Sequence, residues 1–199
     1  MKRAVLLLPL VSLLAVTSPA LAQFGKVQAP PKTTMSVWLG GYLQPGRVKD
    51  PASGTWDFGS TLAGGIGVHR RFGVLTVGVD ASLAPAVSFE RFDSTGVARG
   101  DARMVTALLS GRLRTGGGGP IGMYLTGGVG TFVYGMPDLD RSWDPDFALH
   151  TGAGLEYQVS NNRSVFLEWG RFWTFHQGEG VRSERVNHSQ IRAGLRFGL

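Results

Sequence analysis

The sequence contains no cysteine, which excludes a disulfide framework and a thiolate metal site. Stretches rich in alanine, leucine, glutamate and lysine are also few, whereas glycine accounts for 30 of 199 residues. Because glycine is unfavourable inside a helix, this composition argues against a helical protein. After residue 22 no segment has 18 consecutive apolar residues, so the sequence predicts no helical membrane span there.

Charge is sparse as well, since Asp, Glu, Lys and Arg together make up 17% of the residues. The formal net charge of +6 raises the question of a nucleic-acid partner, because a basic balance favours such binding. The arginines, however, are scattered among the predicted strands and turns, and form no basic run or basic helix. We therefore predict that the protein does not bind nucleic acid.

The first 22 residues have the three parts of a secretory signal peptide. Met1-Lys2-Arg3 is a basic start, residues 4–16 are almost wholly apolar, and Ser18-Pro19-Ala20-Leu21-Ala22 supplies small residues before a cleavage site. The apolar part is too short for a spanning helix and is interrupted by Pro9. We expect export through the Sec pathway, cleavage after Ala22, an N-terminal lead over residues 23–32, and one folded domain over residues 33–199.

Apolar and polar residues alternate with a period of two through most of this domain, which is typical of half-buried β-strands. In residues 121–134, for example, Met123, Leu125 and Val129 alternate with Tyr124 and Thr126. Eight such segments predict an all-β protein, with strands at residues 33–43, 55–69, 74–89, 101–114, 121–134, 147–157, 164–175 and 186–199.

The connections between these strands alternate in length. Residues 44–54, 90–100, 135–146 and 176–185 form long polar connections, whereas residues 70–73, 115–120 and 158–163 form short ones. An even strand number, short periplasmic turns and long extracellular loops characterise bacterial outer-membrane barrels. The pattern therefore predicts an eight-stranded, antiparallel, up-and-down transmembrane barrel with both termini in the periplasm.

The two faces of the strands differ in chemistry. One face is aliphatic and aromatic and is expected to contact lipid. The other is rich in Gly, Ser and Thr and carries charges that must pair inside the lumen: Asp80, Arg112, Glu156, Glu168, Arg192 and Arg196. The aromatic residues expected to form interfacial girdles are Trp56, Phe58, Tyr157, Trp169, Trp173, Phe175 and Phe197. A lipocalin-like soluble barrel would invert the faces, but its outside would need many more Lys and Glu residues.

Antiparallel neighbours have a constant sum of residue numbers, which predicts pairs within the lumen. A loop centred near residue 96 places Asp80 opposite Arg112, and one centred near residue 180 places Glu168 opposite Arg192. Glu156 then lies one strand from Glu168 and requires a further arginine, since two carboxylates repel. An eight-stranded barrel is just wide enough for side chains to fill, so we predict a plugged, non-conducting lumen.

The C-terminal residues resemble the assembly signal of outer-membrane barrels. Arg192, Gly194, Phe197 and Leu199 match its pattern, with leucine in place of the usual terminal aromatic residue. Together with the strand pattern, the domain resembles the small outer-membrane barrels of the OmpA, OmpX and opacity types. This resemblance implies a monomer that is surrounded by outer-membrane lipid and lipopolysaccharide and inserted by the barrel assembly machinery.

Residues that could support catalysis or metal binding are poorly arranged for either. Some small barrels that modify lipid A use a His-x-Ser pair, but His188 and Ser189 are adjacent and must point to opposite faces. Glu156 lies about 20 Å along a strand from His150. His69 and His176 are placed at strand ends. The aspartates of one loop fit no EF-hand, and Gly116–Gly119 lacks the residues of a phosphate loop.

We therefore expect no enzyme activity, no cofactor and no metal. The sequence favours a non-catalytic outer-membrane barrel that contributes to envelope integrity or to surface interaction through its loops. Two alternatives remain at this point, namely a narrow channel for small solutes and a lipid A-modifying enzyme.

Overall fold

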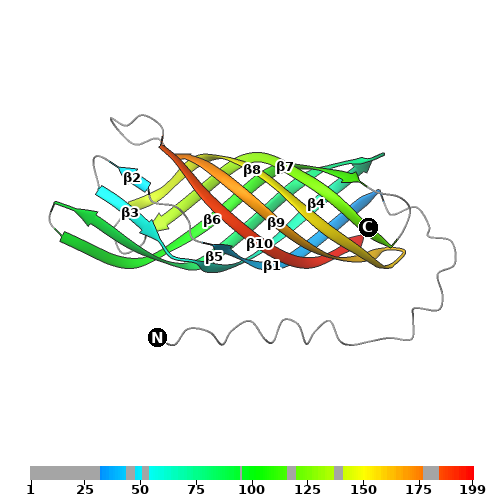
Figure 1. Ribbon diagram of the computed structural model, residues 1–199, viewed down its shortest axis with the longest axis horizontal. Coiled ribbons are helices and arrows are strands. Elements are labelled where there is room, and N and C mark those ends of the chain that lie inside the picture. Colours follow the sequence, from blue (N-terminus) through cyan, green and yellow to red (C-terminus); the bar gives the residue numbers. More distant parts are fainter. Residues whose placement is uncertain are drawn as a thin grey trace.

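The chain folds into a closed antiparallel β-barrel in the computed structural model, which describes residues 32–43, 48–50, 54–94, 96–115, 120–136, 141–176 and 184–199 (Figure 1). The strands are β1 (Thr33–Leu43), β2 (Val48–Asp50), β3 (Gly54–Phe58), β4 (Thr61–Phe72), β5 (Leu75–Asp93), β6 (Gly96–Thr115), β7 (Ile121–Met136), β8 (Arg141–Ser160), β9 (Arg163–His176) and β10 (Glu184–Gly198). None of the described residues forms a helix long and apolar enough to cross a membrane.

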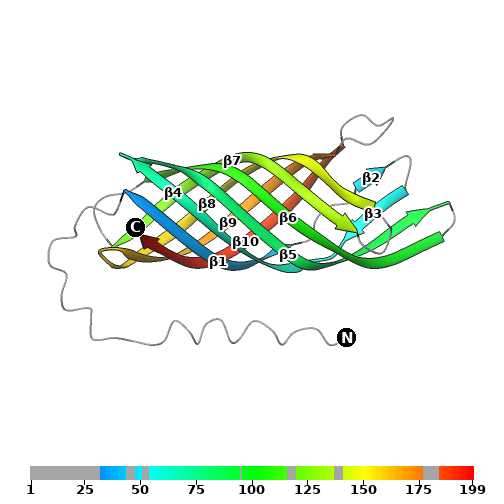
Figure 2. The ribbon, with the colours of Figure 1, turned by 180° about the vertical axis from the view of Figure 1, so that it is seen from behind.

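Eight of these strands, β1 and β4 to β10, form the barrel wall. Each pairs with its neighbour in the chain, and β1 pairs with β10 to close the ring, with Met35 opposite Phe197. Closure leaves no unpaired edge along the wall. The view from behind shows the same continuous ring of tilted strands (Figure 2). The predicted eight-stranded up-and-down barrel is confirmed.

The two ends of the barrel differ. The end that carries the C-terminus and the turn between β4 and β5 is called the turn end here. Gly73 in that turn has a φ of 63°, in the left-handed region that tight hairpin turns use and glycine adopts without strain. The opposite end, formed by β2, β3 and residues 87–93 and 96–102 of β5 and β6, is called the crown; it extends at the left of Figure 1.

The predicted loop over residues 90–100 is wrong, because β5 and β6 form an extended hairpin there. The two strands remain paired up to Asp93 and Gly96, so most of that segment is strand. Likewise β7 continues to Met136 and β8 begins at Arg141, within the predicted loop 135–146. Extended hairpins satisfy backbone hydrogen bonds that a loop would leave to water, which explains why polar residues here still form strand.

The second predicted strand, residues 55–69, is interrupted at Gly59-Ser60 and forms β3 and β4. Both segments pair with β5, which has an irregularity between Ala84 and Val87 at the same level. Such an irregularity reverses the alternation of side chains. As a result Trp56 and Phe58 point inward and are 3% and 5% exposed, so their predicted place in an outer aromatic girdle is wrong.

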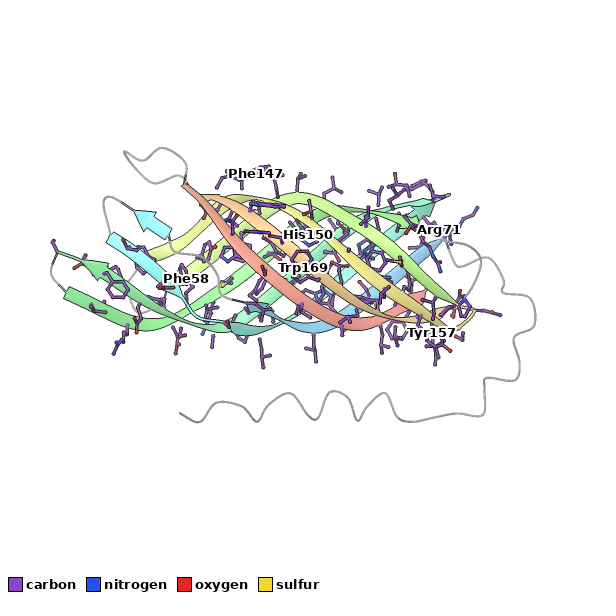
Figure 3. All side chains as sticks on the ribbon, viewed as in Figure 1. Phe58, Arg71, Phe147, His150, Tyr157 and Trp169 are labelled. Atoms are coloured by element: carbon purple, nitrogen blue, oxygen red, sulfur yellow. The ribbon has the colours of Figure 1, made fainter. Side chains whose placement is uncertain are left out.

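The outer face of the wall is apolar. Leu62 is 78% exposed, Ile66 is 60% exposed and Leu109 is 57% exposed, and side chains of this kind cover the outside around the barrel (Figure 3). Trp169, another predicted girdle residue, is 52% exposed. A soluble barrel would bury this face, since large contiguous apolar patches are rare on soluble monomers. The face is suited to contact with lipid.

Candidate functional site: the filled lumen

The centre of the lumen contains a buried ion pair between β9 and β10. Register places Arg192 opposite Glu168, at the position that the sequence arithmetic predicts. The Arg192 Nε donates a hydrogen bond of 2.9 Å to Glu168 Oε1, and its Nη2 donates one of 2.5 Å to the same oxygen. Both residues are at most 3% exposed, so each charge is compensated by a partner rather than by water.

Asp80 forms a second centre, but its predicted register is wrong. Its partner across the ladder is Leu108, whereas Arg112 lies opposite Thr76. The turn between β5 and β6 is centred between Asp93 and Gly96 and so precedes the predicted centre at residue 96. Each residue of β5 therefore faces a residue of β6 that is earlier in the chain than predicted. The long Arg112 side chain nevertheless reaches Asp80 Oδ1 at 3.4 Å. His69 Nε2 lies 3.0 Å from Asp80 Oδ2.

Glu156 is bound by the further arginine that two neighbouring carboxylates require. Arg196 Nη1 lies 2.8 Å from Glu156 Oε2, and Ser164 donates a hydrogen bond to the same carboxylate. Tyr124 connects this pair to the central one, since its hydroxyl donates to Glu168 Oε2 at 2.9 Å and accepts from Arg196 at 3.0 Å. All six predicted lumen charges thus lie inside the barrel in one charge network.

Aromatic rings also hold the arginines of the charge network. The Arg196 guanidinium lies 4.2 Å from the centroid of the Phe166 ring and 4.8 Å from that of Tyr124. Arg192 lies 5.2 Å from the Trp38 ring. Cation–π contacts strengthen when they are desolvated, so these rings stabilise charges that have left water.

Strand glycines provide the space for these large inward side chains. A Cβ atom at Gly154 would collide with the ring and hydroxyl of Tyr124, and one at Gly170 would collide with the His150 imidazole. The abundance of glycine in the sequence therefore has a packing cause. Glycine on one strand accommodates a ring from the next, which lets a narrow barrel close around a filled interior.

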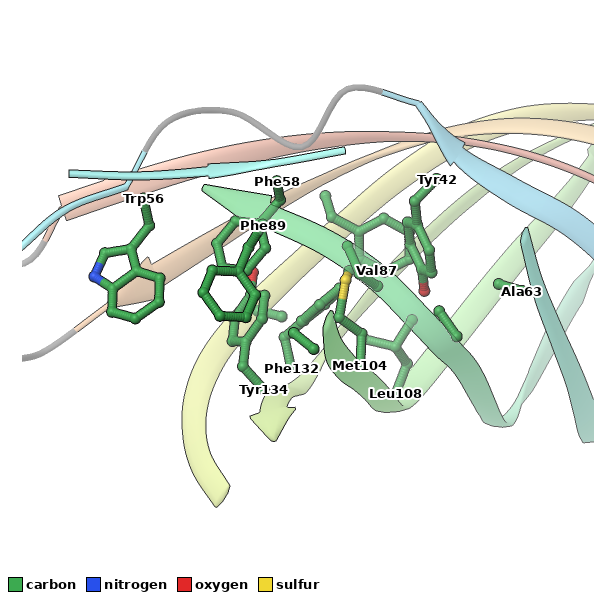
Figure 4. Packing of buried hydrophobic residues seen from close by; sticks show 14 of the residues in the cluster. Tyr42, Trp56, Phe58, Ala63, Val87, Phe89, Met104, Leu108, Phe132 and Tyr134 are labelled. Carbon is green, nitrogen blue, oxygen red and sulfur yellow. The ribbon is translucent and has the colours of Figure 1, made fainter. Parts of the chain in front are cut away.

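An aromatic layer fills the lumen on the crown side of the charge network (Figure 4). Tyr42, Phe132 and Phe172 form its base, with ring centroids 5.6 to 6.0 Å apart. The layer continues into the crown through rings that are all less than 8% exposed: Trp56, Phe58, Phe89 and Tyr134. This layer is not among the sequence-based predictions, which place Trp56 and Phe58 on the outer face. The inward parity of Tyr124 and Phe132 is the signal in the sequence that points to it.

A few buried polar groups lie where the two layers meet. His150 is 2% exposed and Gln190 is 1% exposed, and both ring nitrogens of His150 and both amide atoms of Gln190 have no hydrogen-bond partner among the described residues. His150 Nε2 lies 4.0 Å from Glu168 Oε1 on the neighbouring strand. From the sequence alone, only Glu156 was considered as a carboxylate near His150. Buried groups of this kind are commonly satisfied by internal water.

His188, another residue considered for catalysis, is also enclosed. His188 is fully buried and its Nε2 lies 2.7 Å from the Tyr134 hydroxyl, whereas Ser189 is half-buried on the other face. The side chain of His176 lies outside the described residues. Among the described residues no cluster of His, Asp and Glu suits a metal ion, and two aspartates of the predicted acidic loop, Asp138 and Asp140, are not described.

The residues of the predicted assembly signal lie on both faces of β10 and directly after its end. Arg192 is buried in the lumen, and Gly194 lies against Trp38 and Phe166. Phe197 lies opposite Met35 of β1, and Leu199 is 74% exposed. The signal itself stays a prediction, as does the signal peptide over residues 1–22, which lies outside the described residues.

Comparison with known proteins establishes the fold. No protein-family model and no curated protein matches the sequence. Neisserial surface protein A has a similar structure, with a TM-score of 0.61 and 14% identity over 84% of this chain and 96% of that one. Outer membrane protein OprG of Pseudomonas aeruginosa has a TM-score of 0.57 and 12% identity over 86% of this chain and 98% of that one. The chain therefore has the fold of a small outer-membrane β-barrel.

Proposed function

We propose that this protein is a non-catalytic barrel of a Gram-negative outer membrane that acts through its crown, which meets partners at the cell surface. In this proposal the turn end faces the periplasm, and lipid and lipopolysaccharide surround the wall. The exposed leucine, isoleucine and valine side chains around the barrel support the membrane location, because burying them in lipid removes their contact with water.

The occupied lumen is the observation that carries this proposal. A solute on its way through the barrel would meet the aromatic layer first and the charge network second. At each level the side chains are buried and in contact, with Phe132 and Phe172 almost fully enclosed and Arg192 bound to Glu168. This packing argues against a channel. The protein's remaining means of acting on its surroundings is its surface.

The crown has the features of a contact surface. Phe92 and Val97 are opposite each other in the β5–β6 ladder and are 38% and 55% exposed. Ion pairs lie on the same hairpin, with Arg99 Nε 2.8 Å from Glu90 Oε1 and Arg91 Nη2 2.9 Å from Asp93 Oδ2. An apolar pair framed by charges can contribute both contact area and specificity to binding a partner.

The positions of the three histidines whose side chains are described support a role without catalysis. A general base must come within hydrogen-bond reach of a substrate. His69, His150 and His188 are each at most 2% exposed inside a closed wall. A lipid substrate at the outer face could not reach them without opening the barrel.

Two measurements test the proposal. Planar-bilayer recordings on the purified protein should show no reproducible single-channel steps, and large regular steps would overturn the non-conducting part. The second uses cells in which Glu90–Arg99 is replaced by an Asn-Gly turn between Phe89 and Gly100, which face each other in the ladder. This variant should keep heat-modifiable gel mobility but lose cell adhesion to surfaces, while keeping wild-type resistance to detergent.

If adhesion is unchanged by shortening the crown, the surface role is wrong. If deletion of the whole gene increases sensitivity to detergent and the shortened variant restores resistance, the protein contributes to envelope integrity through its wall instead.

A further inference from the structure

An arginine interrupts the apolar outer face of β9. After Arg163 at the turn end, the outer face of β9 carries Val165, Leu167, Trp169, Arg171, Trp173 and Phe175 in turn. Along this fully described stretch Arg171 is the one charged residue on the face, and its side chain is exposed. The three buried arginines of the lumen, Arg112, Arg192 and Arg196, are all paired, so an outward arginine between two tryptophans requires its own explanation.

Arg171 has no partner of opposite charge in the described part of the chain. Its guanidinium has no hydrogen bond or ion pair there, and its direct neighbours across the two ladders are Ser189 on β10 and Thr151 on β8. Both neighbours are uncharged and, being directly opposite, lie on the same outer face. The three residues thus form a polar cluster across three adjacent strands.

The cluster lies well inside the apolar band rather than above it. Phe147 and Phe175, whose ring centroids are 5.9 Å apart, lie closer to the crown. Phe175 is four residues from Arg171, about 13 Å along the strand at ~3.3 Å per residue. An unpaired arginine on a lipid-facing wall is unfavourable, increasingly so with depth. Its position is explained if an anionic group from outside the chain pairs with it.

We propose that Arg171, Ser189 and Thr151 bind a phosphate group of lipid A in the outer leaflet. This inference rests on the proposed outer-membrane location. Guanidinium groups bind phosphate through two parallel hydrogen bonds, and the two hydroxyls can donate from either side. Facing residues in adjacent strands have Cα atoms roughly 4.5 to 5.5 Å apart, which fits one phosphate. Trp169 and Trp173 supply apolar surface for the acyl chains.

The location on the wall favours lipid over a protein partner. Arg171 lies on the crown side of β9, so in the proposed orientation the cluster faces the outer leaflet, where lipid A carries its phosphates. A soluble partner could not enter the apolar band between Trp169 and Phe175. Lipid molecules are already there, and an arginine side chain can extend toward their headgroups while its aliphatic part stays in the apolar band.

The test uses the protein in detergent micelles, with bound lipid counted by native mass spectrometry. Wild-type protein is titrated with bisphosphorylated lipid A and with the same lipid after enzymatic removal of both phosphates. Arg171→Gln removes the charge, Arg171→Lys retains it, and Arg163→Gln is the matched control, an outward arginine at the turn end of the same strand. Heat-modifiable gel mobility shows whether each variant is folded.

We expect Arg171→Gln to bind phosphorylated lipid A about tenfold more weakly than wild type, given the usual strength of a charge-assisted hydrogen bond. Arg171→Lys should bind at an intermediate level and Arg163→Gln like wild type. The dephosphorylated lipid should bind all four proteins equally weakly. Equal binding of both lipids to wild type, or no effect of Arg171→Gln, would overturn the proposal, as would an Arg171-dependent dimer without lipid.

The proposed function fails in a different way. If the wild-type protein does not insert into bilayers at all, the membrane location is wrong. If it inserts and folds but does not distinguish the two lipids, only the phosphate site is wrong.

Discussion

Single residues inside the barrel are constrained by the wall around them. Charged side chains that point inward are removed from water. They must therefore find partners on neighbouring strands. Arg192 does so with Glu168 on the adjacent strand, and also approaches Asp80 Oδ1 at 3.9 Å. An arginine that links two carboxylates makes the interior a connected unit rather than a set of separate pairs.

Removing Arg192 should therefore be costly. We expect Arg192→Met to lower the free energy of unfolding by about 3 to 5 kcal/mol, since Glu168 is left buried without its cation. The double variant Arg192→Met with Glu168→Gln should lose less than the sum of the two single variants. Urea titration followed by gel mobility measures both, with Arg163→Met as the exposed control. Equal stability of Arg192→Met and wild type would contradict the assigned role.

The glycines that accommodate inward rings give a second prediction. Gly154→Ala should destabilise the barrel by about 1 to 3 kcal/mol, because the new methyl group overlaps Tyr124, and the hydrogen bonds of Tyr124 hinder its movement. Gly111→Ala is the control, since its Cβ would have no neighbour closer than 4.0 Å. The same unfolding assay should separate the two variants. A larger loss for Gly111→Ala would show that side-chain space is not what these glycines provide.

Residue-level contacts were only partly predictable from the sequence. The constant sum of residue numbers correctly places Arg192 opposite Glu168, because β9 and β10 pair without any shift in register. It fails for Asp80, since the position of the β5–β6 turn cannot be read from a polar segment. The bridging role of Tyr124 depends on side chains that cross the lumen from β7 to β9 and β10, which no pairwise rule describes.

At the scale of elements, the strand cores are predictable and their crown ends are not. Alternation in β7 identifies its outer residues because lipid and lumen select opposite chemistry. Beyond the lipid band both faces meet water or the crown, so alternation fades and charged residues such as Glu90 and Arg99 resemble a loop. The interruption at Gly59-Ser60 reverses the faces, which explains the wrong orientation expected for Trp56 and Phe58.

The orientation of these elements in the membrane can be tested with single cysteines, because the chain has none of its own. Ser94→Cys in the crown turn should react with a membrane-impermeant maleimide on intact cells. Arg70→Cys, exposed at the turn end, should react only after the outer membrane is opened. The reverse pattern would place the crown in the periplasm.

The whole molecule is defined by an apolar outside and a filled inside, the reverse of a soluble ligand-binding barrel. The sequence predicts this inversion from sparse charge on the strands and from the chemistry of the two faces. The division of the lumen into a charge network and an aromatic layer could not be predicted, because it depends on how far strands are staggered around the ring. The stagger is set when all eight strands close into a ring, and it cannot be read from any single hairpin.

Methyl NMR of the wild-type protein in lipid nanodiscs tests this central claim most directly. Leu108 and Leu109 are adjacent in β6, yet they are 3% and 57% exposed. A paramagnetic label on lipid acyl chains should broaden the methyl signals of Leu109 and leave those of Leu108 and Thr126 sharp, and a water-soluble paramagnetic chelate should broaden none of the three. Broadening of Leu108 by the lipid label would invert the faces, and broadening of Thr126 by the water-soluble chelate would reveal an open, water-filled lumen.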